Sequence, residues 1–281
     1  MSRRRPLIEV GDAGLECPAG GVWIDPWRPV ERAVITHAHA DHARPGSGSY
    51  LTSTTGREVL RPRLDEQAVI ETLAWGERRR IGDVTVSLHP AGHLFGSAQV
   101  RVEGHGEVWV VSGDYKTVPD RTCEPFEPVA CDVFITESTF GLPVYRWPDQ
   151  DEVFDEVRDW WRGNAAAGRP SVLFAYALGK AQRLLAGVGE GPGPVVVHGA
   201  VDVCTEAYRR AGVELPPTRT VDEVEPDDLG TALVLAPPSA QGSPWMRRFR
   251  RPATAFASGW MRVRGPRRRR AVDRGFVLSD H

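Results

Sequence analysis

Three histidines and one aspartate fall within six residues, in the segment His37-Ala38-His39-Ala40-Asp41-His42. The apolar run Ala33-Val34-Ile35 precedes this segment and predicts a buried strand. Side chains alternate along an extended chain, so His37 and His39 should point to the same side. A turn that begins near Asp41 would redirect Asp41 and His42 toward a neighbouring position. Imidazole and carboxylate donors so arranged favour two adjacent metal ions, zinc first, with manganese or iron as alternatives.

Two later residues fit the same centre. His93 follows the alternating run 84–88, which predicts a strand, and Asp114 follows the apolar run 108–111. A glycine next to each residue permits a close approach of the backbone. Either residue alone is typical of a loop, but together with the first motif they are candidate metal ligands at the ends of strands.

The remaining pattern predicts an α/β protein with a boundary in 141–148, which contains two prolines. Before this boundary we expect a hairpin formed by 98–102 and 108–111, and a strand at 133–135. After it, Asp149 is positioned to cap a helix whose apolar residues have helical spacing. Short apolar runs then alternate with turns, which indicates a parallel sheet; these runs are 172–175, 195–197, 232–236 and 254–257.

The charge is unevenly distributed, although 35 basic and 37 acidic residues nearly cancel. The segment from Trp245 to Gly275 contains 11 arginines and a single acid, Asp273. Such a segment is either a solvated basic surface or the footprint of a polyanion such as a nucleic acid. The aromatic residues Tyr145, Trp147 and Trp260, with Trp245, either stack on bases or pack in the core.

The rest of the composition indicates a cytoplasmic protein. The four cysteines are scattered without a C-x-x-C pair, which fits a reducing compartment. No apolar run is long enough to span a membrane. The basic residues near Met1 have no apolar stretch behind them, so we expect no signal peptide.

The motifs resemble those of a known enzyme family. H-x-H-x-D-H, then Gly-His and Gly-Asp after strands, resembles the metallo-β-lactamase fold. The segments 136–139, 178–183 and 257–261 resemble motifs of the β-CASP nucleases, which include ribonuclease J and the pre-mRNA 3′-end cleavage nuclease. The whole chain is similar to the bacterial ligase-associated DNA exonucleases, with markers at 24–27, 174–180 and 236–245.

This resemblance implies a fold and a domain order. Residues 1–140 would form a metallo-β-lactamase αββα sandwich, and residues 141–265 a small β-CASP-like α/β domain inserted into it. Residues 266–281 would begin the return to the first domain. Family members continue with a strand that ends in a histidine-glycine motif, and this sequence stops at His281. We therefore expect the C-terminal closing elements to be missing, and the second metal to be weakly held or completed by water.

The resemblance also implies roles for single residues. His37, His39 and His93 would hold one zinc ion, Asp41 and His42 a second, and Asp114 would bridge the two. A hydroxide activated by the two ions would attack phosphorus. Glu137 would orient His281, which would protonate the leaving oxygen as general acid.

A further group of residues would contact the substrate. Lys180, with backbone amides after Gly179, is placed to hold a phosphate where a helix begins, although the same pattern suits a plain turn. Ser258 and Gly259 allow the same two interpretations. The resembling motif adds Gln182, and the arginine run adds Arg267 and Arg268.

The resulting hypothesis is a metal-dependent DNA exonuclease of DNA repair that acts on single strands or ends. The resemblance implies an ATP-dependent DNA ligase and a DEXH helicase as partners. Alternatives are an RNA-processing nuclease of the same fold, a thioester or lactam hydrolase, and a nucleic-acid-binding protein with a degenerate metal site.

Overall fold

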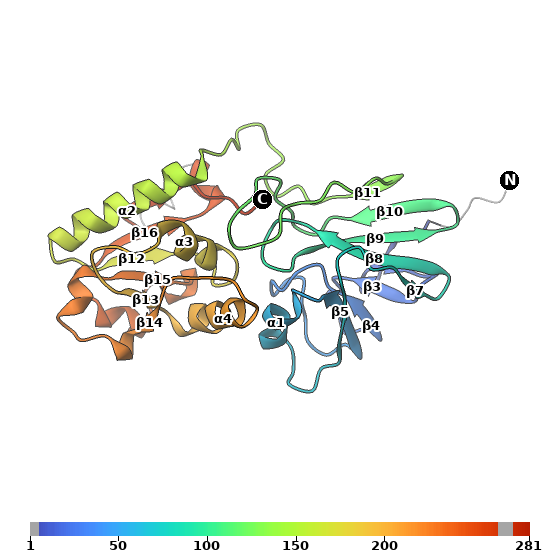
Figure 1. Cartoon of the computed structure of the whole chain (residues 1–281), viewed down its shortest axis with the longest axis horizontal. Helices are drawn as coiled ribbons and strands as arrows, with labels where there is room; N and C mark the ends of the chain where they lie inside the picture. The colour runs from blue at the N-terminus through green and yellow to red at the C-terminus, as the bar shows by residue number, and fades with distance from the viewer. Residues whose placement is uncertain (1–5, 264–271) are drawn as a thin grey trace. The chain divides into compact units, whose positions relative to one another are not determined.

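The computed structural model describes residues 6–263 and 272–281. The chain divides into two compact units, which we call the N-terminal unit (Met1–Thr139 with His281) and the C-terminal unit (Phe140–Asp280). The described residues contain three β-sheets and four α-helices, so the fold is mixed α/β (Figure 1).

The first sheet of the N-terminal unit follows the order of the chain. Its strands are β1 (Glu9–Gly11), β2 (Gly14–Cys17), β3 (Val22–Ile24), β4 (Arg32–Val34), β5 (Ser49–Ser53) and β6 (Ile70–Leu73). β1 to β3 pair antiparallel, whereas β3 to β6 pair in parallel. Because β3 and β4 are parallel neighbours, the segments that follow them begin at the same edge of the sheet.

The second sheet of this unit has the order β11-β10-β9-β8-β7. Its strands are β7 (Arg79–Ile81), β8 (Val84–Pro90), β9 (Ala98–Gly104), β10 (Glu107–Val111) and β11 (Val133–Ile135). All neighbours pair antiparallel except β10 and β11. The predicted strands at 84–88 and 133–135 are confirmed, as is the hairpin of β9 and β10.

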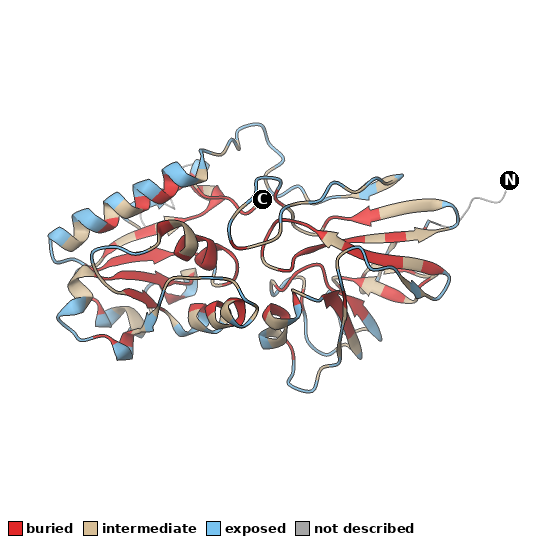
Figure 2. Ribbon diagram, in the orientation of Figure 1, coloured by how far each residue is buried: buried red, intermediate tan, exposed pale blue. Residues whose placement is uncertain are grey.

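The two sheets of the N-terminal unit share one hydrophobic core. Val34 and Leu51 of the first sheet pack in the same cluster as Val86, Leu88 and Val100 of the second sheet. Figure 2 shows the buried residues along these strands. In the described part of this unit α1 (Arg57–Leu60) is the α-helix, beside the 3₁₀ turn Arg61–Arg63. The resemblance implied outer layers of helices; among the described residues of this unit, α1 is the α-helix that such a layer could include.

The C-terminal unit contains the parallel sheet that the sequence predicted, with the order β14-β13-β15-β12-β16-β17. Its strands are β12 (Ser171–Phe174), β13 (Val195–Val197), β14 (Arg219–Thr220), β15 (Leu233–Ala236), β16 (Ala253–Ala257) and β17 (Arg274–Phe276). Every neighbouring pair is parallel. Both faces are buried: Leu173 faces one core and Phe174 the other, as expected for a parallel sheet.

Three helices accompany this sheet: α2 (Gln150–Ala166), α3 (Lys180–Val188) and α4 (Gly199–Arg210). Asp149 caps α2, as predicted, because its carboxylate accepts hydrogen bonds from the amides of Asp151 and Glu152. Trp161 is fully buried against the sheet. The remaining short 3₁₀ turns are Val221–Glu223, Asp228–Thr231, Pro238–Ala240, Pro244–Arg248 and Gly259–Arg262.

The expected return to the first domain begins at residue 266, in a stretch that lies outside the described residues. The C-terminal unit extends to Asp280. The reason is backbone pairing: β17 adds to the sheet beside β16, with Phe276 opposite Ala257. His281 alone at this end is grouped with the N-terminal unit.

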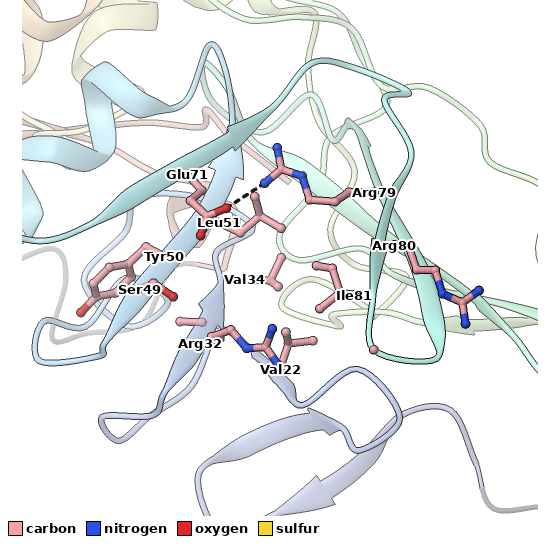
Figure 3. Close-up of a pocket in the computed structure, with 12 residues that line it drawn as sticks. Val22, Arg32, Val34, Ser49, Tyr50, Leu51, Glu71, Arg79, Arg80 and Ile81 are labelled. Atoms are coloured by element: carbon pink, nitrogen blue, oxygen red, sulfur yellow. Dashed lines mark hydrogen bonds and ion pairs between the residues drawn. The ribbon is translucent and has the colours of Figure 1, made fainter.

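A cavity of about 220 Å³ lies between strands of the N-terminal unit (Figure 3). Its apolar walls include Val22 and Leu51, and its arginines are already engaged: Arg79 pairs with Glu71, and Arg32 donates to the carbonyl of Gly20. In the part of the chain that the structure describes, no helix is long and apolar enough to cross a membrane.

Candidate metal centre

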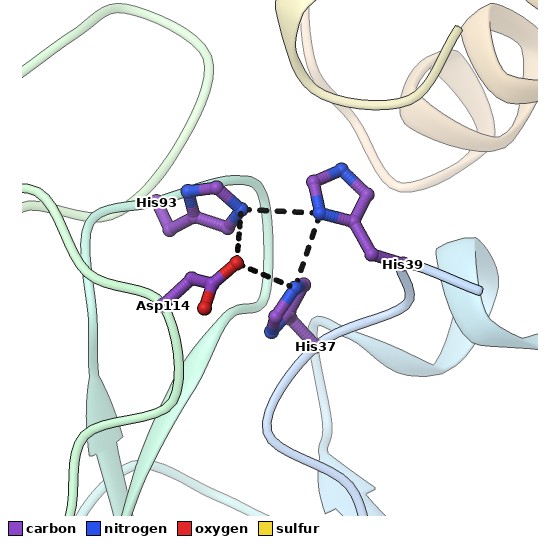
Figure 4. Close-up of side chains that lie close together, drawn as sticks. All are labelled: His37, His39, His93 and Asp114. Carbon is purple, nitrogen blue, oxygen red and sulfur yellow. Dashed lines mark hydrogen bonds and ion pairs between the residues drawn. The ribbon is translucent and has the colours of Figure 1, made fainter. Parts of the chain in front are cut away.

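Four predicted ligands converge at strand ends in the N-terminal unit. His37 and His39 follow β4, His93 follows β8 and Asp114 follows β10. His39 Nδ1 lies 3.1 Å from His37 Nε2 and 3.2 Å from His93 Nε2. Asp114 Oδ2 lies 3.5 Å from His37 Nε2 and 3.7 Å from His93 Nε2. Figure 4 shows the four side chains pointing toward one another.

This cluster has the chemistry of a cation site. One ligand atom from each of the four residues lies within 4.8 Å of the others, so a single ion fits between them. Imidazole nitrogens facing one another at hydrogen-bond distance need either protons or a cation between them. Burial, with the charges of His42, His39 and His93, lowers the pKa of His37 well below its usual value. His37 is therefore neutral, as a metal ligand must be.

A second group of atoms lies on the other side of Asp114. Its Oδ1 is 3.5 Å from His42 Nε2, which is 3.8 Å from Asp41 Oδ2. The two oxygens of Asp114 thus face different groups, Oδ2 toward His37 and His93 and Oδ1 toward His42. Burial raises the pKa of Asp114. The geometry suits a carboxylate placed between two cations.

Asp25 organises both groups, and the sequence reading did not assign it a role. Its carboxylate accepts hydrogen bonds from the amide and hydroxyl of Thr36 and lies 2.7 Å from His42 Nδ1. Burial lowers the pKa of His42, but the hydrogen bond and charge of Asp25, with the charge of Asp114, outweigh this and raise it to about 9. Asp25 directly follows β3, which is parallel to β4, so it lies at the same edge of the sheet as His37. This placement could have identified it as a residue of the site.

These contacts fix which ring nitrogen of His37 and of His42 faces Asp114. His42 Nδ1 donates to Asp25, so Nε2 faces Asp114 and carries the proton that a bound metal would replace. The hydroxyl of Thr36 donates to Asp25, so its oxygen accepts from His37 Nδ1 at 3.1 Å. The lone pair of His37 Nε2 is then free to bind a metal. The Asp25 carboxylate therefore orients one imidazole in each group, His42 directly and His37 through Thr36.

Glu137 and His281 also come together beside the histidine cluster. His281 Nδ1 lies 2.7 Å from Glu137 Oε1, and Glu137 Oε2 accepts from the amide of Thr139. Burial raises the pKa of Glu137, but the hydrogen bonds from His281 and Thr139 outweigh it and lower the pKa to about 2. The ring centroids of His281 and His93 are 4.8 Å apart. The described Asp114, Glu137 and His281 offer a further group of metal-binding atoms.

The residues predicted to contact phosphate are mostly engaged inside the C-terminal unit. Lys180 is 3% exposed and its ammonium lies 2.7 Å from Asp280 Oδ2. Gln182 is buried and bonds to the amide of Gly179, the carbonyl of Ala177 and the hydroxyl of Thr205. Gln182 thus caps the start of α3, and the ammonium of Lys180 binds the segment that ends at Asp280. Their contact with a phosphate stays a prediction.

Ser258 and Gly259 are also buried. The Ser258 hydroxyl accepts from the amide of Trp260, and a side chain on Gly259 would collide with Phe140. Tyr145, Trp147 and Trp260 pack with Phe140 in one aromatic cluster. Trp245 packs against Phe249 and His198. Arg267 and Arg268 lie outside the described residues.

No protein-family model matches the chain. It is 35% identical over 274 residues to a probable DNA ligase of Opitutus terrae, a match that covers 95% of this chain and 26% of that protein. It is 26% identical over 215 residues to a ribonuclease of Thermus thermophilus, covering 65% and 48% respectively. It is 31% identical over 162 residues to cleavage and polyadenylation specificity factor 73 of Drosophila melanogaster, covering 55% and 23%.

A solved structure shares the fold. A protein of unknown function from Enterococcus faecalis superposes with a TM-score of 0.58 at 11% identity, covering 89% of this chain and 70% of that one. The chain spans about a quarter to a half of the length of the three curated relatives.

Proposed function

Because this chain belongs to the metallo-β-lactamase/β-CASP nuclease family, we propose that it is a metal-dependent nuclease that hydrolyses phosphodiester bonds in DNA during repair. One observation carries the proposal: the two oxygens of Asp114 face two separate groups of imidazole and carboxylate donors. A pair of adjacent cations suits the charge of a phosphodiester better than that of a neutral ester.

DNA is proposed over RNA because of how much of the chain each relative matches. The match to the probable DNA ligase extends over 95% of the chain, whereas the match to the ribonuclease covers 65%. RNA processing is the second candidate, since relatives named endoribonuclease match over 42% of the chain. That fraction includes neither the whole C-terminal unit nor the whole N-terminal unit.

We assign the N-terminal unit to the metallo-β-lactamase sandwich and the C-terminal unit to a β-CASP-like insert. The two sheets that share one core support the first assignment, and the parallel sheet with helices supports the second. The segment after Ile135 leads from one unit to the other, and the chain returns at His281.

The centre would hold two zinc ions, with manganese as the alternative. His37, His39 and His93 would hold one ion, Asp41 and His42 the other, and Asp114 both. When bound, the ions would supply positive charge for the phosphoryl oxygens and for the attacking water. Through Thr36 and Asp25, the protein holds Nδ1 of His37 and of His42 and so turns their Nε2 atoms toward Asp114.

His281 would protonate the oxygen that leaves phosphorus. Its Nδ1 donates to Glu137, which leaves Nε2 to carry the transferable proton. The low pKa of Glu137 keeps this carboxylate charged, and its charge favours the protonated imidazole. Glu137 thereby offsets the effect of nearby cations, which would otherwise expel the proton.

A nuclease assay tests the proposal. Single-stranded DNA and RNA labelled at either end are incubated with zinc or manganese, and products are resolved by length. We expect DNA to be shortened progressively from one end, and Asp114→Asn to abolish this in a folded protein. Preferential cleavage of RNA would favour the second candidate, and equal activity of Asp114→Asn would contradict the two-metal centre.

Paired variants test the proton donor. We expect Glu137→Gln and His281→Ala each to slow turnover without loss of metal, and the double variant to be no slower than His281→Ala. A substrate with an activated leaving group needs no general acid, so Glu137→Gln and His281→Ala should each cleave it at the wild-type rate. If both variants are equally slow on that substrate, the assignment of His281 is wrong.

We also propose a DNA ligase as partner and the cytoplasm as location. The match covers 26% of a protein named a probable DNA ligase, so a region similar to this chain occurs within that polypeptide. The four scattered cysteines, which include no C-x-x-C pair, are in keeping with a reducing compartment. The helicase partner rests on the family resemblance alone.

A further inference from the structure

The long connection between β10 and β11 is tied to the loop that carries His93. The amide of Lys116 donates to the carbonyl of Ala91 at 3.0 Å, and the amide of Glu127 donates to that of Pro90 at 3.1 Å. Between them, Glu124 accepts from the amide of Gly96. Asp114 lies at the start of this connection. The two loops that carry His93 and Asp114 are therefore joined along their length.

A buried ion pair fixes the shape of this connection. Lys116 Nζ lies 3.0 Å from Asp120 Oδ2, and both side chains are 4% exposed. The ammonium also donates to the carbonyl of Val118. The other oxygen of Asp120 accepts from the amide and hydroxyl of Thr122, both at 2.8 Å. An isolated charge at this depth is costly, so the two residues hold each other in place.

The connection between β10 and β11 packs closely against the loop that carries His93. Gly92 has φ +73°, and a side chain there would lie 2.3 Å from the carbonyl oxygen of Lys116. The thiol of Cys123 lies 3.4 Å from the carbonyl of Gly92 and 3.5 Å from Asp120. Any shift of Lys116 or Asp120 is thus transmitted to the backbone of Gly92, the neighbour of His93.

We propose that the Lys116–Asp120 ion pair is a positioning device that sets the spacing of His93 and Asp114 and thereby the metal affinity of the centre. Both residues act through the backbone of Gly92 and of the segment after Asp114, and neither is itself a proposed ligand. The inference rests on the proposed metal centre, and it identifies the residues that hold two of its ligands 3.7 Å apart.

The test measures zinc binding to the metal-free protein by competition with a chelator. Asp120→Asn keeps the size of the side chain and an oxygen for Thr122, but removes the charge that holds Lys116. We expect about a 10–100-fold loss of zinc affinity, the range seen when the groups that support metal ligands are removed. Cobalt in place of zinc should give an altered visible spectrum.

Asp83→Asn is the matched control, because Asp83 pairs with Arg80 in the same unit but is 81% exposed. It should bind zinc as the wild type does. A merely structural ion pair would lower the melting temperature of metal-free Asp120→Asn and leave the zinc affinity and cobalt spectrum of the folded protein unchanged. That result would overturn the proposal.

A neutral double variant covers the case in which Asp120→Asn does not fold. Lys116→Met with Asp120→Asn removes both charges, so no buried ion is left alone. We expect the same weakening of zinc binding, and wild-type affinity in this variant would overturn the proposal. Zinc titration of the wild type separates the positioning role of the ion pair from the nuclease function. If the wild type binds zinc but cleaves no nucleic acid, the proposed function is wrong, and the zinc affinities of the variants still test the positioning role.

Discussion

Replacing Asp280 by asparagine should destabilise the C-terminal unit strongly. Asp280 accepts contacts from two cations: Lys180 Nζ at 2.7 Å and Arg183 Nη1 at 3.1 Å. The side chains are 3%, 7% and 8% exposed for Lys180, Arg183 and Asp280. The sequence pattern allowed Lys180 either to hold a substrate phosphate or to lie in a plain turn, so this variant also tests whether Lys180 is an internal anchor that pairs with Asp280.

The magnitude follows from which charges remain. Removing one partner of a buried ion pair costs about 3–5 kcal/mol, and Asp280→Asn withdraws the carboxylate from two cations at once. Because domains are stable by about 5–15 kcal/mol, the loss is a large fraction of the total. Lys180→Met keeps the contact between Arg183 and Asp280, so we expect a smaller cost of about 1–3 kcal/mol.

Urea unfolding, followed by tryptophan fluorescence and circular dichroism, measures both costs. Trp161 is buried in the C-terminal unit and reports on its core. Asp159→Asn is the control, because its pair with Arg162 is exposed and should change stability by less than about 0.5 kcal/mol. If Asp280→Asn lowers the free energy of unfolding by no more than this control does, the pairing of Lys180 and Arg183 with Asp280 does not anchor the unit. Loss of DNA affinity in a fully stable Lys180→Met protein would restore the phosphate site.

Three further outcomes are expected. Asp25→Asn should lower zinc affinity about 10–100-fold, because the amide nitrogen cannot accept the proton of His42 Nδ1; competition with a chelator measures this. Neutralising Arg267 to Arg270 should reduce the slope of log affinity for single-stranded DNA against log salt by up to about 3; an unchanged slope would mean that these arginines do not contact phosphate. Burial raises the pKa of the thiols of Cys17 and Cys123, so both should react with maleimide far more slowly in the native protein than in urea, as peptide mass spectrometry would show.

The sequence predicted the features that depend on local pattern. The strands before His37, His93 and Asp114 follow from apolar runs, and because each ligand lies just after a strand, their convergence follows from sheet geometry. Asp149 was recognisable as a cap because a capping carboxylate bonds to amides two and three residues ahead.

The features missed depend on distant partners. Lys180 and Asp280 are separated by a hundred residues, and no periodicity in either segment reveals that they meet. A glycine followed by lysine has the same local pattern whether the ammonium binds a phosphate or a carboxylate of its own chain. Asp25 was missed because β3 has only three residues and a proline follows it, so the run has the appearance of a turn.

The order of strands in the C-terminal unit determines when this unit can fold during synthesis. Ser171 in β12 pairs with Leu233 in β15 and Ala253 in β16, and neither partner exists until sixty to eighty more residues have been added. At about 5–20 residues per second, β12 stays unpaired for several seconds on the ribosome. The segment Ser171–Phe174, which is buried in the folded unit, therefore stays without its neighbouring strands in the nascent chain until β15 and β16 have been made.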